Sequence, residues 1–429
     1  MKTLIFITSR FPYDPGEAFI DSEFPFLCSA FDKKIIITRN VTGKKLKTIP
    51  QDVKVYRHNP ASSFKEYLLI DLLVLRNLKK IGAMIREELH FRIEAGRKIS
   101  FVKKLLLVKA IIKSLQLRDF ISKVIKIEKP EGELVLYSYW MNTGARAICM
   151  LDNVKATRIS RAHRVDLYEE EADHKYLPLV KHTFRNLNAI FFISEHGKRY
   201  FENSFGLINE NNIVSRLGVI NRFPFKPEVS DRDHFRIVSC SSLTNVKRIH
   251  LLISALGMVR SSKKIIWNHF GEGPLEKELK AFAEKSLGSL SNIEYKFMGR
   301  VMNAQILEFY NTNNIDILIN TSSSEGIPVS IMEAQSFGMP VIATDTGGTA
   351  EIIGKETGIL LPVDFDVADL ARQIEYLLNL DHAEKGRMKR AIYDNWKMNF
   401  NAFTNFEKFI KNIDTIVSSD QHENRRGYN

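Results

Sequence analysis

Short, strongly apolar runs alternate with longer segments of helical periodicity in the first half of the chain. The runs "KTLIFIT" at 2–8, "KKIIIT" at 33–38 and "ELVLYSY" at 133–139 have the length and composition of buried strands. The segment 63–128 instead has apolar residues at helical spacing, as in "FVKKLLLVKAIIKSL". Strands that alternate with helices predict a parallel sheet covered by helices, which is an α/β fold.

The stretch "RLGVINRFPFKPEVSDRDHF" at 216–235 interrupts this alternation with two prolines, scattered charges and no clear periodicity. It is typical of a linker, and a second series of strand-like and helical segments follows it. A chain of 429 residues is also too long for one hydrophobic core. We therefore expect two doubly wound α/β domains. Their expected limits are 1–220 for the first, 221–395 for the second, 396–417 for a C-terminal helix that crosses back to the first domain, and 418–429 for a polar tail.

The composition is that of a soluble globular protein, with 44% hydrophobic and 26% charged residues. No apolar run in the sequence approaches the roughly 18 residues of a membrane-spanning helix. The N-terminal "MKTLIFITSRF" is too short in its apolar part for a signal peptide, so we expect it to form the first strand. Cys28, Cys149 and Cys240 are widely separated, have no metal-type spacing and suit a reducing compartment. We therefore expect a cytoplasmic location.

The formal net charge of +12 is unevenly placed along the chain. Between Arg76 and Lys129 there are 15 lysines and arginines against 5 aspartates and glutamates, a local excess of +10. One interpretation is a set of solvated helix faces. The other is peripheral binding to an anionic membrane surface at the inner face, because "FVKKLLLVKAIIKSLQLRDF" mixes lysines with long apolar side chains at helical spacing. Nucleic acid is not expected as a partner, since no recognised nucleic-acid motif accompanies the charge.

The segment "TSSSEGIPVSIMEAQSFGMPVIATDTGGTAEII" at 321–353 contains two glutamates, Glu325 and Glu333, among many glycines and serines, whose backbone is accessible to a ligand. Glu325 lies in a loop expected at the carboxyl end of a buried strand, where open α/β sheets bind their ligands. Pro328 suits the first turn of a helix whose positive end favours a phosphate. Glu325 and Glu333 can each accept hydrogen bonds from hydroxyls, so a diphosphate between two polyols fits, as in a nucleotide sugar. The alternative is a surface-loop glutamate followed by a charge that interacts with the helix dipole.

The spacing from Glu325 to Glu333 resembles the Glu-x7-Glu signature of the family 4 retaining glycosyltransferases. The segments "SSLTNVKRIHLLISAL" and "HFGEGPLEKELKAFA" resemble the family in the same order, and the likeness is nearly continuous from 237 to 363. "SRAHRVDLYEE" at 160–170 is similar to a segment of the family's other domain. The resemblance implies the GT-B fold of two facing Rossmann-like domains. It assigns the acceptor to 1–220 and the nucleotide sugar to 221–395.

The resemblance also implies roles for individual residues. Lys247 would neutralise the donor diphosphate, Glu333 would bind the ribose hydroxyls, and Glu325 would contact hydroxyls of the donor sugar. His163 would lie close to the donor sugar, and Gly16 would let the first loop approach the ligand. Glu325, His163 and Lys247 are therefore the candidate catalytic residues. His163 is alternatively a polar residue between strand and loop that has no catalytic role.

The remaining donor-site residues line the ligand mainly through their backbone or lie near the base. Many members of the family have an arginine a few residues before the lysine, but here Ser242 stands in that place. We expect Arg248 to supply the second positive charge instead. The residues of this group are Arg248, Gly326, Ile327, Pro328, Val329, Ser330, Arg300 and Val301.

The resemblance implies transfer of a sugar from a nucleotide sugar to a hydroxyl of a saccharide or lipid-linked acceptor, with retention at the anomeric carbon. We expect surface polysaccharide or glycolipid assembly as the setting. No metal and no cofactor are expected, since the sequence lacks an obvious Asp-x-Asp metal loop and "DFD" at 364–366 lies outside the expected site. Two alternatives remain, a sugar-nucleotide epimerase on a similar scaffold and a basic nucleic-acid-binding protein. A dinucleotide oxidoreductase is disfavoured, because no clean Gly-x-Gly-x-x-Gly follows the first strand.

Overall fold

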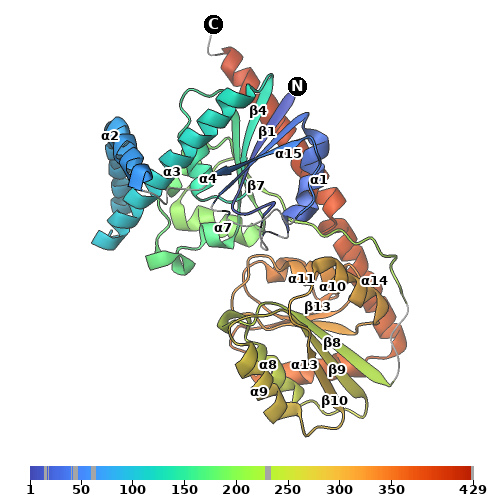
Figure 1. Ribbon diagram of the computed structural model, residues 1–429. Coiled ribbons are helices and arrows are strands. Elements are labelled where there is room, and N and C mark those ends of the chain that lie inside the picture. The colour runs from blue at the N-terminus through green and yellow to red at the C-terminus, as the bar shows by residue number, and fades with distance from the viewer. Residues whose placement is uncertain are drawn as a thin grey trace. The chain divides into compact units, whose positions relative to one another are not determined.

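The computed structural model divides the chain into two compact units, and each has its own parallel sheet (Figure 1). Unit 1 comprises Met1–Ser215 and Phe406–Asn429, and unit 2 comprises Arg216–Asn405. The expected domain limits at 220 and 395 lie within about ten residues of these divisions. The structure describes residues 1–13, 17, 19–39, 41, 47–58, 64–227 and 233–426, and their side chains apart from those of 64–72 and 420–426.

Unit 1 is built around a seven-stranded parallel sheet with strand order β3-β2-β1-β4-β5-β6-β7. Helices follow most of its strands, as the sequence predicts, and the basic segment forms the two long helices α2 and α3. The strands are β1 Lys2–Thr8, β2 Lys33–Arg39, β3 Val53–His58, β4 Glu133–Ser138, β5 Thr157–Ala162, β6 Ala189–Phe192 and β7 Asn212–Val214. The helices are α1 Ile20–Ala30, α2 Phe64–Glu94, α3 Phe101–Glu128, α4 Thr143–Cys149, α5 Arg164–Leu167, α6 Val180–Asn186 and α7 Glu195–Phe205, with 3₁₀ turns η1 Glu169–Glu171 and η2 Asp173–Lys175.

Strand β1 is buried on both faces, so its side chains enter two different hydrophobic cores in alternation. Leu4 and Phe6 point to the core that includes α1, whereas Ile5 and Ile7 point to the core that includes α3, α4 and α7. A continuous apolar run is therefore the expected pattern for a central strand of a parallel sheet. Both layers of helices flank the sheet in Figure 1.

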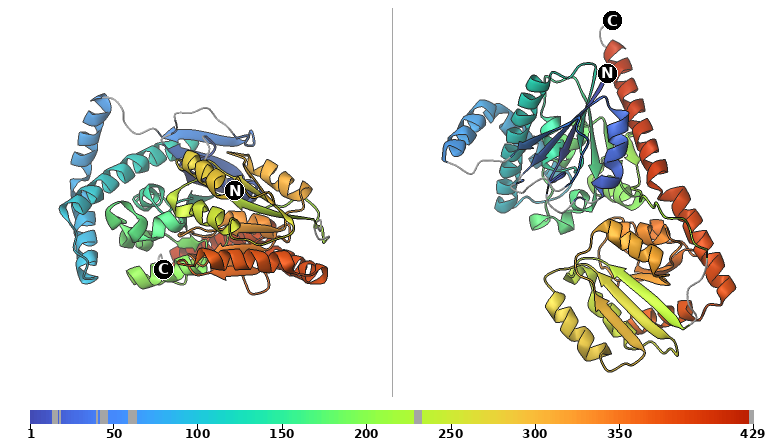
Figure 2. Two further views of the ribbon diagram at one scale, coloured as in Figure 1. Left: turned by 90° about the horizontal axis from the view of Figure 1, so that it is seen from below. Right: turned by 45° about the vertical axis from the view of Figure 1, so that its right-hand side comes forward.

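The last helix, α15 (Ala402–Arg426), contributes to the core of unit 1 on the α1 face. Its buried side chains at helical spacing include Phe409, Ile413 and Val417, which pack with the strands of the first sheet. The right-hand view of Figure 2 shows the long C-terminal helix in red. The expected crossing of the C-terminal helix to the first domain is confirmed. The helix continues to Arg426, where the sequence predicts a polar tail from residue 418, because no glycine or proline interrupts it before Gly427.

Unit 2 contains a six-stranded parallel sheet with strand order β10-β9-β8-β11-β12-β13. Helices α8, α9 and α13 share one core with one face of this sheet. The strands are β8 His234–Cys240, β9 Lys264–Phe270, β10 Ile293–Phe297, β11 Ile317–Asn320, β12 Val341–Thr344 and β13 Gly358–Leu361. The helices are α8 Ile249–Leu256, α9 Glu276–Leu287, α10 Asn303–Thr312, α11 Val329–Gln335, α12 Thr349–Ile352, α13 Val367–Asn379 and α14 His382–Asn399, with the 3₁₀ turn η3 Asn245–Lys247.

Both sheets reverse their strand order beside their first strand. In unit 1 the reversal lies between β1 and β4, and in unit 2 it lies between β8 and β11. The loops at the carboxyl ends of the strands separate at such a point and leave a crevice, which is where doubly wound folds bind their ligands. The α/β fold with two doubly wound units is confirmed, and these two edges are the places to look for a site.

Candidate active site

The loop after β8 and the loop after β11 are joined by an ion pair at the carboxyl edge of the unit 2 sheet. Lys247 Nζ lies 2.6 Å from Glu325 Oε1, although the two residues are 78 positions apart. Both side chains are largely buried, with 22% and 12% of their surfaces exposed. Asn320, the last residue of β11, donates from Nδ2 to the same carboxylate oxygen at 3.2 Å. Two of the predicted catalytic residues therefore lie in contact.

Arg248, the next residue, has a left-handed backbone with φ 48° and turns its guanidinium away into neighbouring loops. Its Nε donates to the carbonyl oxygen of Thr321 at 2.7 Å, and Nη1 donates to that of Val363 at 2.6 Å. These bonds tie the loops after β11 and β13 to the start of α8. The geometry favours a bracing role, and the predicted contact of Arg248 with the diphosphate stays a prediction. Ser242, in the place of the family's arginine, is exposed.

Glu333 lies inside α11 and is buried, with 7% of its surface exposed. Its Oε1 accepts a 2.6 Å hydrogen bond from Nδ2 of Asn303, the first residue of α10. Burial raises the pKa of the Glu333 carboxyl to about 7, and the Asn303 hydrogen bond acts in the opposite direction. Arg300 and Val301, which were predicted to lie near the nucleotide base, belong to the loop between β10 and α10, just before Asn303. The loops after β8, β10 and β11 thus bring the predicted donor residues to one edge.

The segment from Gly326 to Ser330 forms the turn into α11, as the sequence predicts. Ile327 and Pro328 are buried, whereas Gly326, Val329 and Ser330 are partly exposed. The backbone N–H of Gly348 donates to the carbonyl oxygen of Gly326 at 2.6 Å, which joins this turn to the glycine pair after β12.

Gly347, the first residue of this pair, has φ 57°, a conformation that favours glycine. The helix ends at Gln335, and Gly338 with φ 69° follows it. Both glycines therefore allow turns of the backbone that other residues rarely adopt.

His163 belongs to unit 1, where it follows β5 and precedes α5. Its backbone N–H donates to Oδ2 of Asp166 at 3.2 Å, so this aspartate caps the start of α5. The imidazole packs on the rings of Trp140 and Tyr139, with centroids 4.5 and 4.8 Å away. Neither ring nitrogen of this buried histidine has a hydrogen-bond partner among the residues described. Gly16 lies outside the described residues.

Sequence reasoning missed Glu17, which organises the first loop of unit 1. Its carboxylate accepts hydrogen bonds from the backbone N–H groups of Ser9, Arg10 and Phe11 at 3.0, 2.7 and 2.6 Å. The Nε1 atom of Trp140 donates to the same carboxylate at 2.6 Å. Asn303 and Asn320 were also missed. Asparagines that begin a helix or end a strand at a carboxyl edge are the signal that could have found them.

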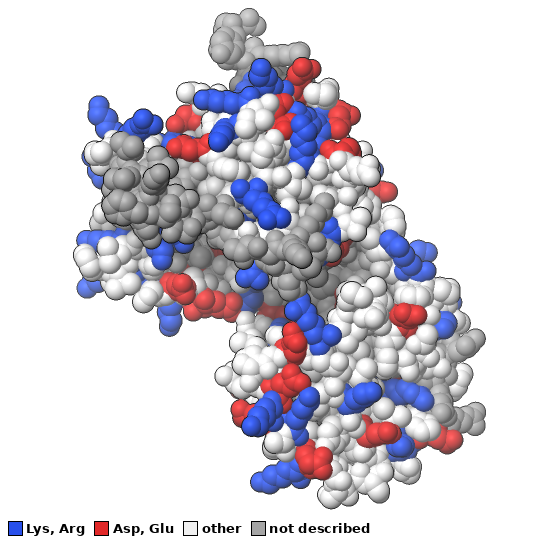
Figure 3. Space-filling view, in the orientation of Figure 1, with Lys and Arg blue, Asp and Glu red and all other residues white. Residues whose placement is uncertain are grey.

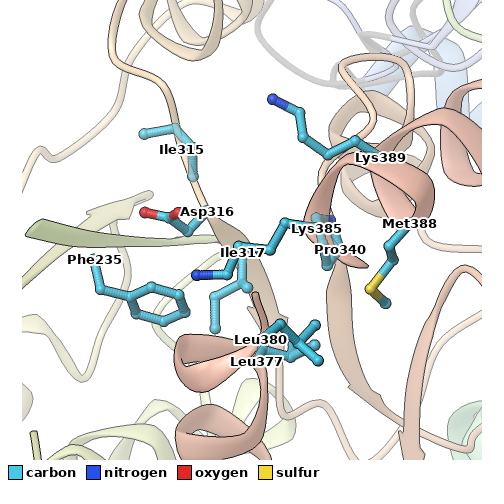
Figure 4. A pocket seen from close by; sticks show the side chains of 10 residues that line it. All are labelled: Phe235, Ile315, Asp316, Ile317, Pro340, Leu377, Leu380, Lys385, Met388 and Lys389. Atoms are coloured by element: carbon cyan, nitrogen blue, oxygen red, sulfur yellow. The ribbon is translucent and has the colours of Figure 1, made fainter. Parts of the chain in front are cut away.

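The small cavity in Figure 4 lies at the opposite edge of the unit 2 sheet. It is lined by residues at the beginnings of strands, such as Phe235 of β8, Ile317 of β11 and Pro340 just before β12. Its volume is about 20 Å³, whereas a single water needs roughly 10–15 Å³. Lys385, on its wall, donates to the carbonyl oxygen of Leu378. This cavity is too small for a nucleotide, so the carboxyl edge remains the candidate active site.

The raised pKa of Glu333 predicts a pH dependence of stability. The folded pKa of about 7 lies above the ordinary value of 4.5, so the native state holds an extra proton between these values. The contribution of the protonated Glu333 carboxyl to the free energy of unfolding is fully present below about pH 4.5 and is lost as the pH rises through 7. Glu333→Gln should remove this loss and make unit 2 more stable than the wild type at pH 8, by up to about 3 kcal/mol. Urea unfolding at several pH values measures the free energy of unfolding of both proteins. The same pH dependence in the wild type and in Glu333→Gln would contradict the prediction.

Comparison with known proteins agrees with the geometry of unit 2. The family described as "Glycosyl transferases group 1" matches residues 222–395. WcaL of Escherichia coli K12, named for colanic acid biosynthesis, is 25% identical over 246 residues, which are 56% of this chain and 59% of WcaL. The O-antigen biosynthesis glycosyltransferase WbnH of Escherichia coli is 29% identical over 182 residues, 42% of this chain and 46% of WbnH. The chain thus matches about half the length of these curated relatives.

Solved structures cover nearly the whole chain at low identity. HepE of Anabaena in complex with UDP-glucose has a TM-score of 0.64 at 15% identity over 96% of this chain and 99% of HepE. Sucrose-phosphate synthase of Thermosynechococcus elongatus has a TM-score of 0.70 at 13% identity over 98% of this chain and all of that one. These likenesses establish the GT-B fold. Residues 222–395, which contain the lysine–glutamate pair and the buried Glu333 at one sheet edge, are thus similar to the group 1 glycosyl transferases.

Proposed function

We propose that this protein is a retaining, metal-independent glycosyltransferase that moves a sugar from a nucleotide sugar to an acceptor hydroxyl. The observation that carries the proposal is the contact between Lys247 and Glu325, with Glu333 on the same carboxyl edge. The lysine offers a positive charge to a diphosphate, and the two carboxylates offer acceptors to hydroxyl groups on either side of it. The fold and the family match of residues 222–395 support the same activity.

In the proposed reaction the bond from the anomeric carbon to the diphosphate breaks, and a bond from the acceptor oxygen forms on the same face. The proton of the acceptor hydroxyl passes to the departing diphosphate. Negative charge grows on the departing diphosphate, and Lys247 stabilises it at the moment of bond breaking. The donor diphosphate replaces Glu325 as partner of Lys247, which frees Glu325 to accept hydrogen bonds from the donor sugar. Retention is inferred from the family resemblance. The positive groups of the protein take the place of a metal ion.

The relatives point to a setting for this activity. WbnH is named for O-antigen biosynthesis, and AmsK of Erwinia amylovora, 28% identical over 178 residues, for amylovoran biosynthesis. These 178 residues are 40% of this chain and 42% of AmsK. We propose assembly of a surface polysaccharide in the cytoplasm, on a saccharide or lipid-linked acceptor. Since the HepE structures contain UDP and UDP-glucose, UDP-sugars are the first donors to test.

A thermal-shift screen against UDP-, GDP- and ADP-sugars tests the donor class, and product analysis then tests the reaction. A binder should raise the melting temperature, because it stabilises the folded state by mass action. The anomeric configuration of the product, read by NMR, tests retention, and activity in excess EDTA tests metal independence. Conversion of the donor without any acceptor would instead support an epimerase. Failure of all nucleotide sugars to bind would contradict the proposal.

We also propose that the turn between α2 and α3 rests on an anionic membrane surface at the inner face. Phe101 and Leu105 at the start of α3 are 74% and 55% exposed, and Ile93 at the end of α2 is 72% exposed. Lysines and arginines surround these helices at the left of Figure 3. Apolar side chains rimmed by positive charge suit the interface of an anionic bilayer. Within the residues described, no helix is both long and apolar enough to cross a membrane.

Co-sedimentation with liposomes tests this membrane contact. The wild type should bind anionic vesicles and not neutral ones, since each lysine or arginine near the surface contributes on the order of 1 kcal/mol. The double variant Phe101→Ser/Leu105→Ser and the variant with Lys103, Lys104, Lys109 and Lys113 changed to Gln should each lose most of this binding. Ile208→Ser is the matched control, because Ile208 is 74% exposed elsewhere in unit 1. Equal binding to both kinds of vesicle would count against the idea.

A further inference from the structure

A cavity of about 360 Å³ opens in unit 1 at the carboxyl edge of its sheet. Asn142 and Thr143, just after β4, form part of its wall, and Asp166, after β5, forms another part. Helix α3 contributes Lys109 and Lys113. The volume falls at the lower end of ligand-binding pockets, which span roughly 300–1,000 Å³. The cavity lies beside the reversal of strand order between β1 and β4, where a ligand of this sheet is expected.

Arg146, on the wall of this cavity, and Arg39, which contacts the wall residue Asn142, use only part of their hydrogen-bonding capacity. Arg146, on the wall, donates from Nη1 to the carbonyl oxygen of Pro178 and from Nη2 to Oγ1 of Thr143, both at 3.2 Å. Arg39 donates from Nη2 to Oδ1 of Asn142 at 3.4 Å. The Nε atoms of both arginines are buried and have no partner among the described residues. A guanidinium carries five N–H donors, so several remain for a ligand.

Neither arginine forms an ion pair with a carboxylate of the described residues, and Lys109 and Lys113 form none either. Two more deeply buried arginines of unit 1 are paired with carboxylates. Arg92 Nε lies 2.8 Å from Glu88, and Arg161 Nε lies 2.8 Å from Glu23. A partly buried charge without a carboxylate partner is costly, so the arrangement at the cavity favours an anionic ligand.

The electrostatic environment of the cavity is positive. Burial, together with the charge of Arg39, lowers the pKa of Arg146 to about 10, while Asp166 and Glu88 act in the opposite direction. Burial also lowers the pKa of Lys113, and Lys109, Arg39 and Arg146 add to the effect. Two carboxylates line the cavity. Asp166 accepts the backbone N–H of His163, and its charge partly offsets that of the two arginines, whereas Asp173 is exposed.

We propose that this cavity binds a phosphate or diphosphate group carried by the acceptor substrate, an inference that rests on the proposed function. Such a group presents several charged oxygens, which match the free guanidinium N–H groups, the rim lysines and the amide of Asn142. Asp166 links the cavity to His163, because it lines the cavity and accepts a hydrogen bond from the backbone N–H of His163. An acceptor held by its phosphate therefore places its sugar near the histidine expected at the donor sugar.

Titration calorimetry with inorganic pyrophosphate tests the site in the full-length Lys247→Gln variant, where the proposed donor site is disabled. In this background Arg146→Gln should weaken pyrophosphate binding at least 10-fold, since a charge-assisted partner is lost. The double change Lys109→Gln/Lys113→Gln, at exposed positions that do not threaten folding, should weaken it as well. Lys123→Gln, an exposed lysine of the same helix outside the cavity, is the matched control and should have no effect.

A dodecyl diphosphate distinguishes the two sources of the phosphate. Tighter binding of dodecyl diphosphate than of pyrophosphate supports a lipid-linked acceptor, and equal binding supports a soluble phosphorylated one. Unchanged pyrophosphate affinity in folded Arg146→Gln and in the lysine double variant would overturn the site. That outcome differs from a failure of the proposed function, which would appear as loss of nucleotide-sugar binding by the wild type.

Discussion

Lys247→Ala should weaken nucleotide-sugar binding by about 10- to 150-fold while the protein stays folded, because the change removes a charged hydrogen-bond partner. In the structure this lysine is held 2.6 Å from Glu325 by its ion pair, so its position is set before the ligand arrives. Such pre-organisation lowers the entropy cost of binding. Titration calorimetry with the donor found in the thermal-shift screen gives the affinity directly. The loss should be smaller in high salt, since the contact with a diphosphate is electrostatic.

The chain contains a matched control for this experiment. Lys280 pairs with Glu276 at 2.7 Å on the exposed surface of α9, in the same unit and with the same chemistry. Lys280→Ala should leave donor affinity unchanged, because an exposed pair contributes little and this one lies away from the sheet edge. A Lys247→Ala protein that binds the donor as tightly as the Lys280→Ala protein would exclude a role of this lysine at the diphosphate.

Glu23→Ala should destabilise unit 1 by about 3–5 kcal/mol, because it leaves a buried arginine without its partner. Arg161 and Glu23 are fully buried, and Nε of Arg161 lies 2.8 Å from Oε2 of Glu23. The other carboxylate oxygen accepts a 2.6 Å hydrogen bond from the hydroxyl of Tyr137. The guanidinium also lies 4.2 Å from the ring of Phe409, so the pair supports the docking of α15 on unit 1.

Urea unfolding followed by circular dichroism measures this effect. Asp152→Ala is the control, since Asp152 forms an exposed ion pair with Lys80 in the same unit and should cost at most about 1 kcal/mol. The double variant Glu23→Met/Arg161→Met should recover much of the loss, because buried ion pairs are often replaceable by apolar side chains. A loss of less than about 1 kcal/mol in Glu23→Ala would show that the buried charge finds another partner.

The sequence by itself determined the elements and the class of the fold. Apolar runs and helical periodicity are local properties, readable over a dozen residues, and they predicted both series of strands and the final helix that packs on unit 1. It also predicted Glu325 and Glu333 as ligand-binding residues, because strand–loop–helix order places such loops at a carboxyl edge. The family resemblance added their individual roles, which local pattern alone does not contain.

Only the tertiary structure decided which side chains meet. Strand order brings Lys247 to Glu325 over 78 positions and Asn303 to Glu333 over 30 positions, and no periodicity in the sequence encodes either contact. Arg248, predicted at the diphosphate, donates to backbone carbonyls of the loops after β11 and β13, contacts that only the tertiary structure reveals. The lack of a carboxylate partner for Arg39 and Arg146 among the described residues is likewise visible only in the tertiary structure. The partners of an arginine depend on its burial and on residues distant in the sequence. Local pattern sets the elements, whereas long-range packing sets the electrostatic partners on which binding depends.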